Sequence, residues 1–62
     1  WSMRIYIVEY GYEYDAGGVI CVTTNEELAR KCYNETGFGE WVKLSSCDQN
    51  NNNWVLLAKK EQ

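Results

Sequence analysis

The sequence contains no proline and no histidine, and none of its apolar runs approaches 18 residues. The absence of histidine excludes mechanisms that need an imidazole as base or nucleophile. The short apolar runs exclude a membrane-spanning helix, which needs about 18 or more consecutive apolar residues. At 62 residues, the chain also has no room for a cofactor domain beside a substrate domain. No cofactor and no membrane partner are therefore expected.

The composition is nevertheless that of a folded protein. Hydrophobic residues make up 45% of the chain and aromatic residues 15%, which is too rich for a disordered segment. A core of this size is only marginally able to offset the entropy lost on folding. A second copy or another partner would relieve that shortage.

The charge and the cysteine content reduce the range of partners and metals that we expect. The net charge is −3, and the six basic residues form no dense stripe, so nucleic acid is not an expected partner. Cys21, Cys32 and Cys47 are widely spaced, with no CxxC pair, which is typical of free buried thiols in a reducing cytosol. One disulfide with a spare thiol is the alternative. A zinc site would need a fourth ligand from a carboxylate, and no metal site is expected.

The start of the chain suggests where the domain begins. Met3 follows Trp1 and Ser2, so we expect Met3 to be the natural start and residues 1–2 to be a cloning remnant. Residues 3–62 then form a single domain. No signal peptide is recognisable, which favours a cytoplasmic protein.

The order of the predicted elements is ββαββ. Residues 4–10 predict a strand that could extend to Tyr14, and residues 19–23 predict its hairpin partner. Residues 15–18 form the turn, where Gly17 and Gly18 would supply positive φ. Residues 40–46 and 54–59 predict two more strands, joined by a loop that contains the four asparagines at 50–53. The fold class is therefore α+β, with a four-stranded, largely antiparallel sheet and one helix.

Residues 25–36 predict the helix. Thr24 and Glu27 have the spacing of a capping box, in which Thr24 is the N-cap. Gly37 is suited to the left-handed position after the last turn. One side of this helix carries the less polar residues Leu28, Ala29, Cys32, Tyr33 and Thr36.

The strands have more apolar faces than one helix can cover. Ile5 and Ile7 alternate with Tyr6, Val8 and Tyr10 in the first strand. In the second strand, the same alternation places Val19 and Cys21 on one face and Ile20 and Val22 on the other. In the last strand, it places Trp54, Leu56 and Ala58 on one face and Val55 and Leu57 on the other. An uncovered apolar face favours a homodimer; twisted or edge strands are the alternative. Candidate residues for the dimer or sheet face are Tyr6, Val8, Trp41, Trp54 and Leu56.

The first hairpin predicts a second surface. Tyr6, Tyr10, Tyr12 and Tyr14 share one parity along the chain, an arrangement that suits either a protein interface or cross-strand packing. The other parity carries Glu9, Glu13 and Asp15. These carboxylates are either solvated charges or groups that act as general acids and bases or bind a cation. An acidic, tyrosine-rich tip fits a basic protein partner best. The predicted partner-binding residues are Tyr10, Tyr12, Glu13, Tyr14 and Asp15.

No catalytic constellation is recognisable. Ser45, Ser46 and the cysteines lack a histidine base, so we expect no enzyme activity and no catalytic residue. Residues 37–39, Gly-Phe-Gly, follow a predicted helix instead of opening one, which excludes a dinucleotide-binding loop.

A resemblance covers the first two thirds of the chain. The segments Ile5–Val8 and Val19–Thr24, the helix opening Glu26–Ala29, and Gly37-Phe38 resemble a group of short, uncharacterised phage and bacterial ββαββ domains. The resemblance implies a phage-encoded protein in the host cytosol, and no catalytic residue. It suggests an inhibitor that binds a bacterial defence protein directly, as anti-CRISPR proteins do. The alternative is a protein that sequesters a small molecule or nucleotide in a pocket at a homodimer seam.

Overall fold

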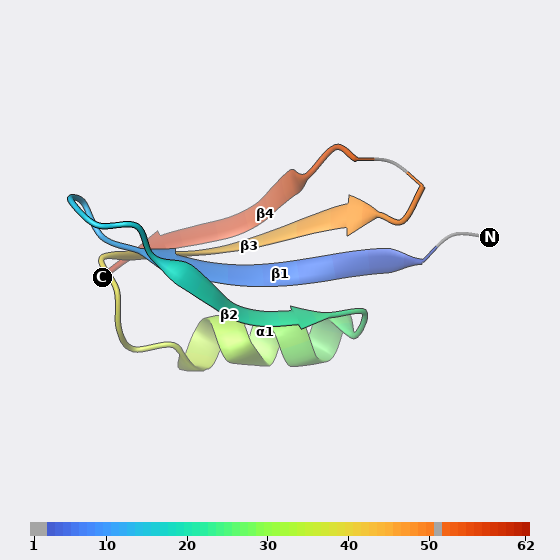
Figure 1. Ribbon diagram of the computed structural model, residues 1–62. Helices are drawn as coiled ribbons and strands as arrows, with labels where there is room; N and C mark the ends of the chain where they lie inside the picture. Colours follow the sequence, from blue (N-terminus) through green and yellow to red (C-terminus); the bar gives the residue numbers. More distant parts are fainter. Residues whose placement is uncertain (1–2, 51) are drawn as a thin grey trace.

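The computed structural model describes residues 3–50 and 52–62, and it confirms the predicted α+β class. The elements are β1 (Arg4–Gly11), β2 (Gly18–Thr23), α1 (Glu26–Glu35), β3 (Trp41–Asp48) and β4 (Val55–Glu61) (Figure 1). The expectation for Trp1 and Ser2 lies outside the described residues, as does Asn51 of the asparagine loop.

The described strands form one antiparallel sheet in the order β2-β1-β3-β4. The predicted hairpin of β1 and β2 is confirmed. β3 and β4 form a second hairpin, and α1 joins the two hairpins so that β1 and β3 become central neighbours. The β1–β2 loop, the α1–β3 connection and the C-terminus lie at one end of the sheet (Figure 1).

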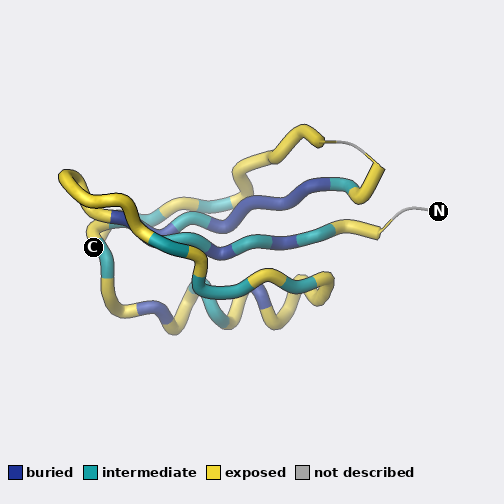
Figure 2. Tube along the Cα trace, in the orientation of Figure 1, coloured by how far each residue is buried: buried dark blue, intermediate teal, exposed yellow. Residues whose placement is uncertain are grey.

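The core lies between α1 and one face of the sheet. Its buried members are Tyr6 and Val8 from β1, Val42 and Leu44 from β3, and Ala29 from α1 (Figure 2). The short Ala29 side chain is fully buried and allows the helix to approach the strands closely. α1 lies against β2, β1 and β3, and it reaches β4 through Tyr33, whose ring centroid is 5.0 Å from Lys60 Nζ. The opposite face of the sheet is not covered by any other described part of the chain.

The helix begins one residue later than predicted. Asn25, not Thr24, is the N-cap: its Oδ1 accepts a hydrogen bond from the backbone N–H of Leu28 at 3.2 Å. The Thr23 hydroxyl accepts from the backbone N–H of Asn25 at 3.0 Å. Because β2 runs to Thr23, the chain uses residue 24 to turn, and the cap moves to Asn25.

The helix end also differs from the prediction. α1 ends at Glu35, and the C-cap Thr36 is extended. The hydroxyl and the backbone N–H of Thr36 both donate to the Cys32 carbonyl, at 2.7 and 3.1 Å. Since these bonds satisfy the carbonyl, no left-handed glycine cap forms, and Gly37 does not have positive φ.

The first hairpin loop does not use glycine as predicted. Neither Gly17 nor Gly18 has positive φ; among the described residues only Gly39 does, at 87°. Gly17 instead passes so close to the Tyr10 carbonyl that a Cβ would overlap it. β1 ends at Gly11, so the predicted extension of the strand to Tyr14 is wrong.

Bulges in both edge strands overturn the predicted alternation there. In β2, Cys21 pairs with Val8 while Val19 pairs with Glu9, so Ile20 is an extra residue. Val8 and Glu9 point to opposite faces of β1, and their partners do the same. Val19 and Cys21 therefore lie on opposite faces and not, as predicted, on the same one.

The same irregularity occurs in β4. Ala58 pairs with Leu44 and Leu56 pairs with Ser45, which leaves Leu57 as the extra residue. Ala58 therefore packs on the core side of the sheet, whereas Leu56 lies on the opposite face. The prediction that these two share a face is wrong.

A polar contact ties the helix to the sheet at the start of α1. The Tyr6 hydroxyl donates to Glu26 Oε1 at 3.2 Å, and Arg30 Nε donates to Glu26 Oε2 at 2.9 Å. The hydrogen bonds from Arg30 and Tyr6 lower the pKa of Glu26. Burial, together with the Glu26 carboxylate, raises the pKa of Tyr6.

We expect Leu44→Ala to lower the free energy of unfolding by about 2 to 5 kcal/mol, because it leaves a cavity at a fully buried position. Leu28→Ala on the exposed side of α1 is the matched control and should change stability by less than about 0.5 kcal/mol. Urea unfolding followed by circular dichroism measures both. Equal losses for the two variants would contradict the assignment of the core.

The Glu26 contact predicts a pH dependence of stability. Glu26 has a lowered pKa in the folded state, so its contribution is present above the unfolded pKa and is lost as the pH falls through the folded one. Tyr6 has a raised pKa, so its contribution is lost as the pH rises through the folded-state value. Urea midpoints measured across pH should show a weaker acid dependence in Glu26→Gln and a weaker alkaline dependence in Tyr6→Phe. Curves parallel to that of the unmodified protein would contradict both assignments.

Candidate protein-docking surfaces

The first candidate surface is a group of aromatic rings at the end of the sheet that carries the β1–β2 loop. The Tyr10 ring makes edge contacts with Tyr12 at 6.0 Å and with Phe38 at 4.9 Å between ring centroids. Tyr12 and Phe38 are themselves exposed, and Tyr14 is 90% exposed. We call Tyr10, Tyr12, Tyr14 and Phe38 the aromatic end.

Glu40 holds this end together. Its Oε2 accepts from the backbone N–H of Glu13 at 2.8 Å, and its own backbone N–H donates to the Gly11 carbonyl at 2.8 Å. The Glu40 carbonyl accepts from the backbone N–H of Gln62 at 2.9 Å, and Gln62 Nε2 donates to the Phe38 carbonyl at 2.7 Å. Three segments that are distant in the sequence are thus joined around the aromatic rings.

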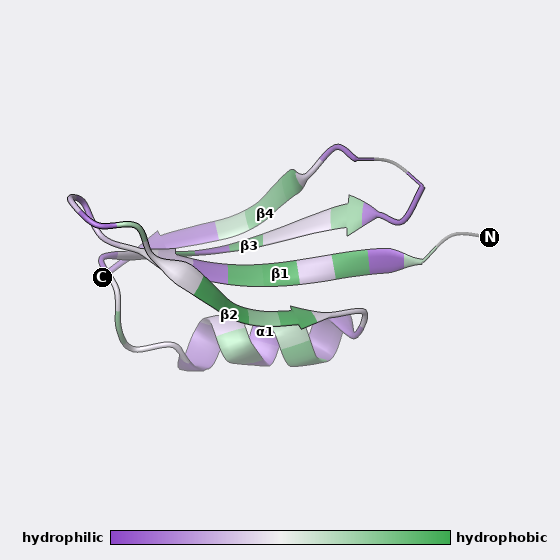
Figure 3. Ribbon diagram, viewed as in Figure 1, coloured by the Kyte–Doolittle hydropathy of each residue, from purple (hydrophilic) through white to green (hydrophobic). Residues whose placement is uncertain are grey.

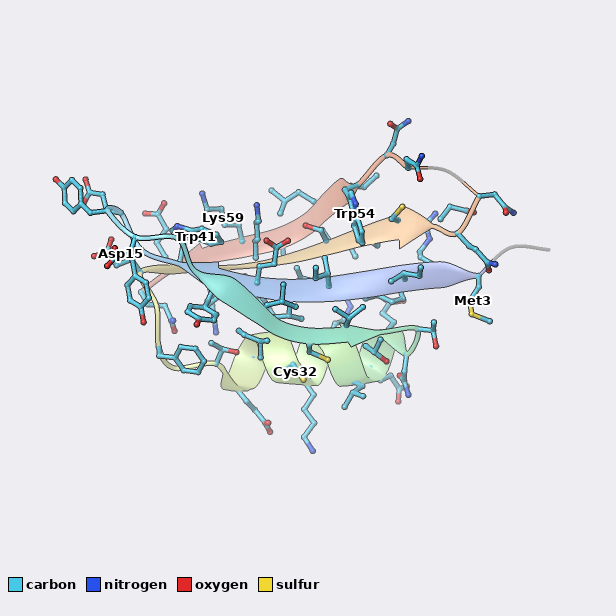
Figure 4. The ribbon with its side chains drawn as sticks, viewed as in Figure 1. Met3, Asp15, Cys32, Trp41, Trp54 and Lys59 are labelled. Carbon is cyan, nitrogen blue, oxygen red and sulfur yellow. The ribbon has the colours of Figure 1, made fainter. Side chains whose placement is uncertain are left out.

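The aromatic end is also acidic. Glu13 and Asp15 lie in the exposed β1–β2 loop, and the exposed Glu40 is hydrogen-bonded to that loop. Figure 4 shows Asp15 at this end, away from the sheet. Carboxylates beside exposed rings favour a partner with basic groups.

The structure brings together only part of the predicted tyrosine and carboxylate sets. Tyr10 and Tyr12 are in contact, but Tyr6 lies in the core. Glu9 lies on β1 beside Lys43 of β3, apart from the loop that carries Glu13 and Asp15. The three carboxylates are therefore not assembled into a cation or acid–base cluster, which the sequence left open as an alternative.

Sequence reasoning missed Phe38 and Glu40. Both reach the β1–β2 loop from the α1–β3 connection, which is more than twenty residues away in the sequence. The one local signal was an aromatic residue between two glycines, Gly37 and Gly39.

The second candidate surface is the face of the sheet opposite α1, which we call the open face. The pleat and the strand pairing place the following residues on it: Ile5, Ile7, Glu9, Gly11, Val19, Val22, Trp41, Lys43, Ser45, Cys47, Leu56, Lys59 and Glu61. Its apolar part includes Val22, 60% exposed, and Leu56, 55% exposed. Figure 3 shows hydrophobic stretches in β1, in β2 and at the start of β4.

Trp41 lies among the charged residues of the open face. Its indole ring lies over Gly11, where a Cβ would overlap it. Lys43 Nζ and Lys59 Nζ lie 5.2 and 5.8 Å from the ring centroid (Figure 4). Lys43 and Lys59 are paired across β3 and β4, where like charges repel. The negative face of the ring offsets that repulsion.

The residues predicted for the dimer or sheet face are divided between the two sides of the sheet. Tyr6 and Val8 are buried beneath α1 and take no part in an exposed surface. Trp41 and Leu56 lie on the open face, and the exposed Trp54 directly precedes β4.

No disulfide joins Cys21, Cys32 and Cys47, and of the predicted buried thiols Cys47 is buried whereas Cys21 and Cys32 are half-buried. Burial and a hydrogen bond with the Cys32 thiol raise the pKa of Cys21, which lowers its thiolate fraction. Cys47 is buried on β3, and Ser46, also buried, accepts a hydrogen bond from Arg4 at 3.0 Å.

Within residues 3–50 and 52–62 there is no group of three or more potential metal ligands and no pocket. No helix in the described part of the chain has the length and apolar character needed to cross a membrane. Comparison with family models, curated proteins and solved structures found no match.

We expect Gly11→Ala to displace the Trp41 ring and to lower the free energy of unfolding by about 1 to 3 kcal/mol, because the new methyl group overlaps the indole. Gly37→Ala is the matched control, since a Cβ there meets nothing within 4 Å. In a Trp41→Ala background the effect of Gly11→Ala should shrink. A double-mutant cycle by urea unfolding measures this coupling, and additive losses would contradict the contact.

Proposed function

We propose that this chain is a homodimeric, non-enzymatic protein-binding module that docks its aromatic end on a basic surface of a partner protein. One observation carries the proposal: exposed aromatic side chains lie on a loop that Glu40 holds in place. Tyrosine and phenylalanine supply large contact areas at a low entropy cost, and they dominate protein interfaces.

Preorganisation supports the same function. The β1–β2 loop is hydrogen-bonded to the α1–β3 connection, which is itself hydrogen-bonded to Gln62. A loop held in this way loses little freedom on binding. The carboxylates of Glu13, Asp15 and Glu40 would speed encounter with a basic partner and set its orientation. The aromatic rings then supply the contact area.

The partner we propose is a bacterial defence protein, which the chain inhibits by direct binding in the cytosol of the host. The resemblance of the first hairpin and the helix opening to short phage domains supports this choice. The absence of enzymatic activity is supported by the burial of Ser45 and Ser46 and by the raised pKa of Cys21.

The homodimer is supported by the open face. Val22 and Leu56 leave apolar area in water on a side of the sheet that α1 does not reach. A two-fold dimer covers such an area with a single self-complementary surface.

The aromatic end can be tested by affinity capture from lysates of bacteria that carry different defence systems. We expect the tagged protein to retain one stoichiometric bacterial protein. Tyr12→Ala/Tyr14→Ala should lower that retention about tenfold or more without changing the melting temperature, because both side chains are exposed. Leu28→Ala, which removes an exposed apolar side chain on α1, should retain the partner fully.

Two results would overturn the proposal. One is undiminished capture by a folded Tyr12→Ala/Tyr14→Ala/Phe38→Ala variant, which would exclude the aromatic end as the docking surface. The other is a captured protein that is retained equally by every variant and by the unrelated tagged control, which would show that no specific partner was bound.

A further inference from the structure

On the open face, β1 and β3 carry different side chains at each level of their pairing. Ile5 is paired with the smaller Cys47, Ile7 with the smaller Ser45, and Glu9 with the basic Lys43. At the fourth level the sizes are reversed, with Gly11 beside Trp41. Ser45 and Cys47 are each only 7% exposed, which shows that neighbouring side chains cover them. At the Glu9–Lys43 level, the face is complementary in charge to a copy of itself in which β1 and β3 are exchanged.

We propose that two copies pack open face against open face, about a two-fold axis that runs parallel to the strands between β1 and β3. This inference rests on the proposed homodimer and specifies its geometry. The rotation places β1 of one copy over β3 of the other and keeps each residue at its own level along the strands. Ile7 then lies above Ser45 of the second copy, and Ile5 lies above its Cys47.

Charge selects this axis. At the next level Glu9 faces Lys43 of the second copy, and symmetry forms that pair twice. A two-fold axis perpendicular to the strands would reverse the levels and set Glu9 against the apolar part of the face. An unpaired carboxylate against apolar side chains is costly. The axis parallel to the strands is the one that pairs opposite charges.

The edge strands meet in the same arrangement. The rotation places β2 over β4 of the second copy, so Val22 meets Leu56 at both margins. These are among the most exposed apolar side chains of the open face. At the Glu9 level Val19 meets the exposed Lys59, whose long side chain keeps its ammonium group in water at the edge. The product is an aligned sandwich of two sheets, with about 10 Å between them.

The axis also decides where the docking surfaces lie. Because it runs along the strands, both β1–β2 loops lie at the same end of the dimer. The two aromatic ends therefore form one paired, two-fold surface that engages two sites of a symmetric or repeated partner at once. Two linked contacts bind more tightly than either alone, because the second is made at high effective concentration.

Exchange of charges between chains tests the geometry. We expect Glu9→Lys to weaken the dimer about tenfold or more, because it sets lysine against Lys43 of the second copy. Lys43→Glu should do the same by setting two carboxylates together. A mixture of the two single variants should form a heterodimer of the original affinity, because every facing pair is then opposite in charge. Sedimentation equilibrium measures the dissociation constants, and circular dichroism verifies the fold.

Matched variants on the helix control for net charge. Glu35→Lys and Lys31→Glu make the same charge changes at exposed positions of α1 and should leave the dimer intact. Val22→Lys should abolish the dimer, whereas Leu28→Lys should not. Dimerisation that survives Glu9→Lys, Lys43→Glu and Val22→Lys would overturn the proposed face. Weakening by both charge variants without recovery on mixing would overturn the proposed axis.

The outcomes separate this inference from the proposed function. If the unmodified protein is monomeric at all concentrations, both the homodimer and the proposed dimer face are refuted. The effect of Tyr12→Ala/Tyr14→Ala on capture would still test the aromatic end. Another outcome is capture that depends on the aromatic end while the dimer is insensitive to Glu9→Lys. That result would support the docking function and refute the proposed dimer geometry.

Discussion

Ala29 is the point at which α1 rests on the sheet, and the width of that single helix limits what the fold can cover. A helix with its side chains is about 10 to 12 Å wide, whereas strands lie about 4.8 Å apart. α1 runs roughly along the strands and contacts β2, β1 and β3 (Figure 1). β4 lies at the margin of that contact, where Lys60 Nζ is 5.0 Å from the Tyr33 ring centroid, and the whole opposite face is left without a second layer among the described residues.

That limit connects the fold to the proposed function. The helix covers only one face of the sheet, so Val22 and Leu56 stay exposed on the other face. In the charged part of this face, Trp41 covers Gly11 and holds two lysines near its ring. An apolar area next to balanced charges favours association with a surface of the same kind, and a second copy has that surface.

The aromatic end depends on a different constraint. Its rings come from the β1–β2 loop and from the α1–β3 connection, and they remain together because Glu40 bonds both the loop and the C-terminal residue. The position of this end follows from the sheet order, which brings the end of β1 beside the start of β3. The proposed docking at the loops and the proposed association through the open face therefore use separate parts of the molecule.

Local patterns determined the class of this protein. The β-branched runs and the turn residues predicted four strands, and the polar and apolar spacing after Thr24 predicted the helix to within a residue at each end. The excess of apolar faces followed from counting one helix against four strands. These inferences succeeded because each depends on residues that are close together in the sequence.

Tertiary structure decided the rest. The bulges at Ile20 and Leu57 reversed which side chains face the core, because register is set by the neighbouring strand and not by the strand itself. Asn25 became the cap because pairing of β2 with β1 extended to Thr23. Phe38 and Glu40 joined the aromatic end only through contacts across more than twenty residues. Local periodicity carries no information about such contacts, since they form only when the sheet order is complete.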